Sequence, residues 1–131
     1  MKIDVKKLYG KNPWDWYDYQ PMLNAFGNIV LQIDDEGYQG DSRVLYDNDG
    51  EIGFLLFGWG SCCGCDALQA CDTIEEVQEL CDKLQNDIKW FEDKETSLEW
   101  FCTHDWEGDY SWYEEKTREF VSKAKDYLKG E

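Results

Sequence analysis

The chain has 131 residues, and 29 Asp and Glu against 13 Lys and Arg give it a formal net charge of −16. That length predicts a single domain. Aromatic residues make up 16% of the chain, which excludes an acidic disordered tail, because such tails are poor in aromatic side chains. A surface this acidic repels phosphates, so the charge excludes direct binding of DNA or RNA and favours a basic partner.

Hydrophobic patterning excludes a membrane protein. The longest apolar stretch, residues 52–59, is far shorter than the roughly 18 residues that a spanning helix needs. The first residues lack the apolar core of a signal peptide. We therefore expect a cytoplasmic protein without membrane contact. In a reducing compartment, the six cysteines indicate metal ligands or redox thiols rather than a disulfide framework.

The first half of the chain predicts strands. Residues 1–27 form an aromatic segment that the pattern assigns to no element. Alternating apolar residues between 28 and 60 then predict a β-meander, whose strands are residues 29–33, 42–46 and 51–59. Asp49-Gly50 supplies the positive φ angles of a tight hairpin turn before the third strand. That strand is apolar at successive positions, which predicts that both of its faces are covered.

Residues 73–129 have the pattern of helices. Thr73 and Glu76 have the spacing of a capping box, and the apolar stripe that follows predicts a helix from Ile74 to Trp90 or Phe91. The same signals predict a short helix that begins at Thr96. They also predict a last helix that begins at Ser111 and ends at Gly130.

Strands followed by helices predict an α+β fold. We expect one domain over residues 1–131, in which an antiparallel meander of about three strands has two to three helices packed on one face. Residues 61–72, which contain the cysteine cluster, join the last strand to the first helix. This junction is the predicted place of a zinc knuckle.

Cys62 and Cys65 form a Cys-x-x-Cys pair in which both thiolates can turn toward one ion. Zinc takes four ligands in a tetrahedron, so two more residues are needed. The preferred ones are Cys71 and His104, with Cys63 as the substitute. Such a zinc would be structural, because its ligands join the end of the sheet to the helical half, which a small core holds weakly.

Cys81, Cys102 and His104 are also possible metal ligands by residue type, but their predicted surroundings differ. Cys81 falls within the apolar stripe of the long helix and is interpreted as a core residue. Cys102 also favours the core, since it lies on the apolar side of its short helix. His104 begins a polar and aromatic loop in which Asp105 could orient the imidazole as a ligand.

A dithiol oxidoreductase using Cys62 and Cys65 is the alternative function, because strand, tryptophan, Cys-x-x-Cys and helix follow one another in thioredoxin-like proteins too. Such a fold also needs a cis-proline well downstream of the dithiol, and no proline follows Pro21. We therefore expect a protein that is not an enzyme.

The acidic excess combines with aromatic residues in a way that suits a basic partner. Carboxylates attract cationic side chains at long range, and aromatic rings stack on guanidinium planes at contact. A run of acidic residues is often only a solvated face. The residues that we expect to contact a partner are Asp34, Asp35, Glu36, Glu75, Glu76, Glu79, Asp105, Glu107 and Asp109.

Three strings of residues resemble small acidic proteins encoded by bacteriophages and prophages. They are Gly37-Tyr38-Gln39-Gly40-Asp41, the segment from Phe57 through Gly58-Trp59-Gly60-Ser61-Cys62-Cys63-Gly64-Cys65-Asp66 to Cys71, and His104-Asp105-Trp106-Glu107-Gly108-Asp109-Tyr110. Small size, strong acidity and a zinc knuckle are similar to phage anti-CRISPR proteins that act on type II-A Cas9. By this resemblance, Cys62, Cys65 and His104 are the functional core, and Cys63 stands where a serine is expected.

The resemblance implies a non-enzymatic inhibitor of phage origin in the cytoplasm of a bacterial host, either monomeric or a weak dimer. Its partner would be a basic nucleic-acid-handling protein, Cas9 above all, which holds its guide–target heteroduplex in a positively charged channel. DNA mimicry and the blocking of a conformational step both remain open as mechanisms. So does a different basic host target, such as a nuclease or a repressor.

Overall fold

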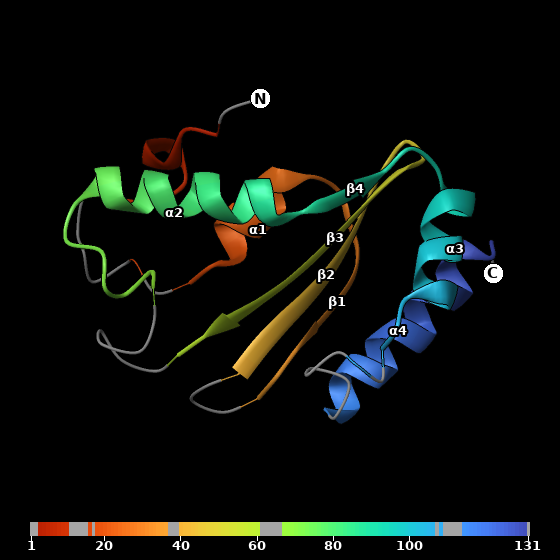
Figure 1. The fold of residues 1–131 in the computed structure, drawn as a ribbon. Helices are drawn as coiled ribbons and strands as arrows, with labels where there is room; N and C mark the ends of the chain where they lie inside the picture. Colours follow the sequence, from red (N-terminus) through yellow and green to blue (C-terminus); the bar gives the residue numbers. More distant parts are fainter. Residues whose placement is uncertain are drawn as a thin grey trace.

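The computed structural model describes residues 3–10, 16, 18–36, 40–60, 67–106, 108 and 114–130. Along these residues the elements are the 3-10 helix η1 (Val5–Lys7), α1 (Gln20–Phe26), β1 (Ile29–Asp34), β2 (Gly40–Asn48), β3 (Glu51–Trp59), α2 (Ile74–Asp87), β4 (Lys89–Phe91), α3 (Lys94–Thr103) and α4 (Glu115–Leu128). The strands form one antiparallel sheet in the order β1-β2-β3-β4 (Figure 1). The predicted α+β class is confirmed.

The β2–β3 hairpin is the centre of the sheet. The two strands pair without interruption from Gly40 opposite Trp59 to Asn48 opposite Glu51. Asp49 and Gly50 form the turn with φ angles of 55° and 100°, and the Gly50 N–H donates to Oδ1 of Asp47 at 2.7 Å. The predicted turn and the predicted bounds of β3 are confirmed.

Alternate side chains of this hairpin point into two separate cores. Val44 and Tyr46 of β2 and Leu55 of β3 lie on one face, which η1, α1 and α2 cover. We call this set the first core, and its buried residues are Val5, Tyr9, Trp16, Tyr19, Met22, Leu23, Phe26, Val44, Tyr46, Leu55, Leu68, Val77, Cys81, Leu84 and Ile88.

The opposite face of the sheet packs against α3 and α4. We call this set the second core, and its buried residues are Ile33, Leu45, Ile52, Phe91, Phe101, Trp106, Phe120, Val121, Ala124 and Leu128. The half-buried Phe54 joins them, with ring-centroid distances of 5.4 Å to Phe101 and 5.5 Å to Phe120. The expectation that all helices lie on one face is wrong, because α1 and α2 lie on one side of the sheet and α3 and α4 on the other (Figure 1).

The helix that begins at Ile74 is shorter than predicted. The predicted N-cap is present, since the Glu76 N–H donates to Oγ1 of Thr73 at 3.2 Å, and the Glu76 carboxylate accepts from the Asp72 N–H at 3.1 Å. The helix ends at Asp87, and Ile88 is extended. The next three residues pair with β3 as β4. The edge of β3 offers backbone partners there, and these override the helical period of the apolar residues.

The remaining helix boundaries differ more modestly. α3 begins at Lys94 because Asp93 is its N-cap, accepting from the Thr96 N–H at 2.7 Å. α4 begins at Glu115, and the predicted start at Ser111 lies outside the described residues. Gly130 has a φ of 85° just after α4, as the predicted stop requires. In the described part of the chain, no helix has the length and apolar character needed to cross a membrane.

The hairpin turn generates a prediction about stability. Replacing Gly50 by Ala should lower the free energy of unfolding by about 1–2 kcal/mol, because a side chain is strained at its positive φ although nothing lies near the added carbon. Chemical denaturation measures the change. Asp49→Asn is the matched control, since asparagine tolerates the left-handed conformation at least as well. Equal losses in the two variants would contradict this account of the turn.

Candidate functional site

Acidic residues converge where β1 ends, β2 begins and β3 ends. A cleft of about 270 Å³ opens there on the first-core side of the sheet. It is lined by Asp18, Tyr19, Gln20, Leu23, Gln32, Asp34, Asp35, Ser42 and Trp59. We call it the aspartate cleft. Of the residues predicted to contact a partner, Asp34 and Asp35 line it, and the exposed Glu36 follows directly.

Polar contacts between α1 and β1 hold the wall of the aspartate cleft. The side-chain amides of Gln20 and Gln32 pair with each other at 2.9 Å and 2.8 Å. The Gln32 amide also donates to both carboxylate oxygens of Asp34, at 3.1 Å and 3.0 Å. Asp18 accepts from the Gln20 N–H at 2.9 Å. These contacts hold two carboxylates in place, and neither carboxylate has a cationic partner among the described residues.

The aromatic part of the cleft is fixed as well. The Trp59 indole N–H donates to the Ser42 hydroxyl at 2.9 Å, and the Tyr19 hydroxyl accepts from the Leu68 N–H at 3.1 Å. The Tyr19 ring packs on Phe57 with a centroid distance of 5.0 Å. Carboxylates beside fixed aromatic rings are the surroundings that favour a guanidinium or ammonium group.

Arg43 lies on the other face of the sheet behind the cleft. Its side chain is fully buried. Nη1 donates to Oδ1 of Asp35 at 2.9 Å, Nη2 to Oε2 of Glu114 at 2.7 Å and Nε to Oγ1 of Thr117 at 2.7 Å. This one guanidinium therefore ties the end of β1 to the start of α4.

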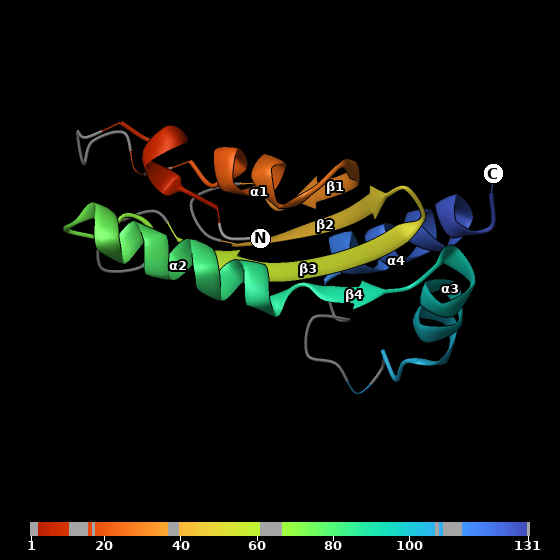
Figure 2. The ribbon, with the colours of Figure 1, turned by 90° about the horizontal axis from the view of Figure 1, so that it is seen from above.

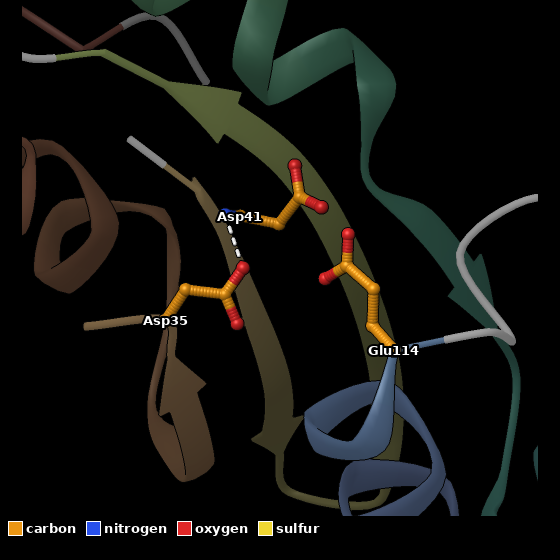
Figure 3. Close-up of side chains that lie close together, drawn as sticks. All are labelled: Asp35, Asp41 and Glu114. Carbon is orange, nitrogen blue, oxygen red and sulfur yellow. Dashed lines mark hydrogen bonds between the residues drawn. The ribbon is translucent and has the colours of Figure 1, made fainter. Parts of the chain in front are cut away.

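Three carboxylates surround this guanidinium. Asp35, Asp41 and Glu114 each bring one oxygen to within 4.8 Å of the others (Figure 3). Carboxylate groups at such spacing suit a hard cation such as Ca²⁺. Arg43 already binds two of the three, so the group is better explained as an internal ion-pair network, in which the arginine is the cation.

The protonation equilibria of the network differ from one carboxyl to the next. Burial alone would raise the pKa of Asp35, but the Asp41 N–H and the Arg43 guanidinium outweigh it and hold that pKa below its ordinary value. Burial raises the pKa of Asp41, which the Arg43 charge opposes and the Asp35 charge reinforces. Burial and the charges of Asp41 and Asp35 also raise the pKa of Glu114. The network therefore holds Asp35 ionised, and its three carboxyl groups outnumber the single positive charge of Arg43.

The proposed zinc ligands are not brought together where the structure describes them. Cys71 packs against the first core, and its thiol donates to the Ala67 carbonyl at 3.3 Å. His104 lies across the sheet, stacked on Trp100 with a centroid distance of 4.6 Å and edge-on to Trp106 at 4.5 Å. Cys62, Cys63 and Cys65 lie outside the described residues. A single ion held by Cys62, Cys65, Cys71 and His104 together does not fit this placement.

Cys81 and Cys102 differ in burial. Cys81 is buried in the first core, as predicted, and burial raises the pKa of its thiol to about 11. Cys102 is exposed, so its assignment to the core is wrong. It occupies the outer side of α3, whereas Phe101 turns inward. The neighbouring Asp105 accepts a hydrogen bond from the Gly108 N–H at 3.1 Å.

A second acidic surface lies on α2. Glu75, Glu76 and Glu79 are all exposed. Together with Asp82 and Asp87, against Lys83, they give α2 five acidic residues and one basic residue, a net charge of −4. α4 has three acidic and four basic residues, a net charge of +1. Charge is therefore unequal on the two sides of the sheet. Glu107 and Asp109 lie outside the described residues.

Sequence reasoning missed several residues of the site. Arg43 lies within the predicted second strand, where a lone charged residue in a strand that ends in Val44-Leu45-Tyr46 was the available signal of a buried ion pair. Asp18, Gln20 and Gln32 join the cleft only because α1 folds onto the sheet. No pattern in the aromatic N-terminal segment predicted that helix, because its stripe of Met22, Leu23 and Phe26 covers only two turns.

No protein-family model, curated protein or solved structure matches this chain.

The network makes opposite predictions for two neighbouring aspartates. Asp35→Asn should lower the free energy of unfolding at neutral pH by roughly 1–3 kcal/mol, because it weakens the pairing of a buried guanidinium. Asp41→Asn should leave the protein at least as stable, because it removes a charge that the folded state disfavours.

The effects of these two substitutions on the free energy of unfolding should depend on pH. The contribution of Asp35, whose folded pKa is lowered, is present above its unfolded pKa and is lost as the pH falls through its folded pKa. The cost of Asp41, whose folded pKa is raised, exists above that pKa and disappears below the ordinary carboxyl range. Denaturation curves of both variants and the wild type should therefore converge in acid. A constant offset at all pH values would contradict the assignment.

Proposed function

We propose that this chain is a non-enzymatic protein that binds a basic, nucleic-acid-handling protein and inhibits it. The aspartate cleft is the observation that carries the proposal. It holds Asp18 and Asp34 in hydrogen bonds with neutral groups, beside the rings of Tyr19 and Trp59. Neither carboxylate has a cationic partner in the part of the chain that the structure describes, and a Lys or Arg side chain of the bound protein would supply one.

The overall charge supports the same function. At −16 the chain attracts a basic surface from beyond contact distance and repels nucleic acid that competes for it. The acidic α2 adds to that field on the first-core side. Cas9 is the partner that the resemblance suggests, since its nucleic-acid channel is positively charged. A basic host nuclease or repressor would meet the same requirements.

The partner can be sought by retention on the purified chain, with Cas9 tested both with and without guide RNA. The double variant Asp18→Asn and Asp34→Asn should weaken retention by at least about tenfold, a change of 1.4 kcal/mol. Both asparagines keep an oxygen for the hydrogen bonds that the aspartates accept.

The matched control carries the same change in charge on the other side of the sheet. Glu95→Gln in α3 and Asp126→Asn in α4 alter two exposed residues there. This control should reduce binding only slightly, through the weaker overall field. Equal losses in the two double variants would mean that net charge alone attracts the partner, and the cleft would then have no specific part.

We also propose that the chain binds one structural zinc through cysteines alone, with Cys63 in the place of His104. The position of His104 across the sheet from Cys71 supports this choice. Four thiolates form a complete structural zinc site, and the metal would stabilise the connection from β3 to α2.

Elemental analysis of two variants tests the ligand set. Cys62→Ser should release the metal and lower the melting temperature sharply, because the binding free energy of a structural zinc contributes to folding. His104→Gln should retain one zinc per chain. Loss of zinc in both variants would restore His104 as a ligand, and wild-type protein without zinc would favour the dithiol oxidoreductase, which a reversible thiol titration would then reveal.

A further inference from the structure

β1 has an outer edge at the margin of the sheet. β1 is the first strand in the sheet order and pairs only with β2 among the described strands. Seen from above, it forms one margin of the sheet (Figure 2). An edge strand presents backbone N–H and C=O groups that can pair with another extended chain.

The register identifies which backbone groups these are. The Asp35 N–H donates to the Asp41 carbonyl at 2.9 Å, and Ile33 lies opposite Arg43 two residues earlier. Residue pairs in an antiparallel ladder alternate between bonded and non-bonded positions. Gln32 and Asp34 are therefore the non-bonded positions, and their N–H and C=O groups point away from β2.

The same two residues line the aspartate cleft with their side chains. A strand added beside β1 would place every second side chain next to Gln32 and Asp34, on the face where the cleft opens. Backbone pairing and recognition of cationic side chains would then act on one ligand at adjacent sites.

We propose that the edge of β1 binds an extended cationic segment of the basic partner as a fifth strand, with alternate Lys or Arg side chains entering the aspartate cleft. This inference rests on the proposed function, and it names the form in which the partner is recognised. Strand addition supplies affinity through the backbone, and the cleft supplies specificity for alternate residues.

Charge argues for a cationic segment and against a second copy of this chain. Pairing two β1 edges would bring Asp34, Asp35 and Glu36 of one copy close to the same residues of the other. Like charges that face each other across strands are destabilising. A segment with alternate cationic residues presents the opposite charge at the same positions.

The first test uses synthetic peptides and the full chain. The probe is a short peptide of alternating Arg and Thr, and its affinity is measured by calorimetry at about 0.15 M salt, where exposed charges more than about 8 Å apart are largely screened. Two derivatives carry N-methyl groups, one on every Arg and one on every Thr. All three peptides have the same charge, but each derivative lacks the N–H groups of one edge.

Strand addition requires that one derivative binds like the parent and the other binds at least about tenfold more weakly. Equal affinities for all three peptides would overturn the proposal, because attraction of charge alone does not distinguish the two edges. Equal losses in both derivatives would also overturn it.

The second test changes the protein. Gln32→Pro removes an N–H that β2 does not use, and proline is tolerated on the outer side of an edge strand. It should weaken binding of the parent peptide at least about tenfold. Gln32→Ala loses the same side-chain contacts with Gln20 and Asp34 but keeps the N–H, so Gln32→Pro should bind the parent peptide at least about tenfold more weakly than Gln32→Ala does. Far-UV circular dichroism tests whether both variants are folded. If Gln32→Pro is unfolded, the N-methyl peptides alone test the proposal.

These measurements distinguish a failure of strand addition at β1 from a failure of the proposed function. If the intact partner binds the wild type, Gln32→Pro and Gln32→Ala alike, the edge inference fails and the proposed function stands. If no basic partner binds the wild type, the proposed function fails, while the peptides still test the edge. A dimer in sedimentation analysis that Gln32→Pro dissociates would show that a second copy occupies the edge, and would overturn the proposal.

Discussion

The pairing of β2 with β3 is the interaction on which the rest of this structure depends. Because side chains alternate across a strand, one hairpin can supply apolar residues to two cores. Val44 and Leu45 are neighbours in sequence and lie in different cores. The first core fixes α1 and α2, and the second fixes α3 and α4. A chain of this size thereby covers both faces of its sheet.

The acidic end of the sheet follows from the same hairpin. Gly40 and Trp59 close the ladder at that end, and the residues that follow Gly40 in β2 are the polar Asp41, Ser42 and Arg43. Arg43 neutralises part of the charge from inside the fold, where a buried guanidinium must be paired to be tolerated. Asp18 and Asp34 lie on the other face and have no such partner within the described ranges of the chain. Strand alternation therefore gives Asp35 to the buried arginine and leaves Asp34 facing the cleft.

Local signals in the sequence predicted the elements that local interactions determine. The Asp49-Gly50 turn, the Thr73 cap and the burial of Cys81 depend on neighbours along the chain, and the structure confirms them. β4 could not be predicted, since its three residues continue a helical stripe and become a strand only beside β3. The separation of Cys71 from His104 depends on which face each helix covers. The spacing of apolar residues along the sequence does not specify which face of the sheet a helix covers.

The division of the apolar residues into two cores has a consequence for dynamics. α3 and α4 are adjacent in the chain, contact each other and together pack on one face of the sheet. The interaction of Asp47 with the Tyr127 hydroxyl and with Lys94 ties them to the hairpin from outside that core. This C-terminal pair has the contacts of a cooperative unit that can open while the hairpin, α1 and α2 stay folded. Amide hydrogens of α3 and α4 would then exchange together, at a free energy below that of global unfolding.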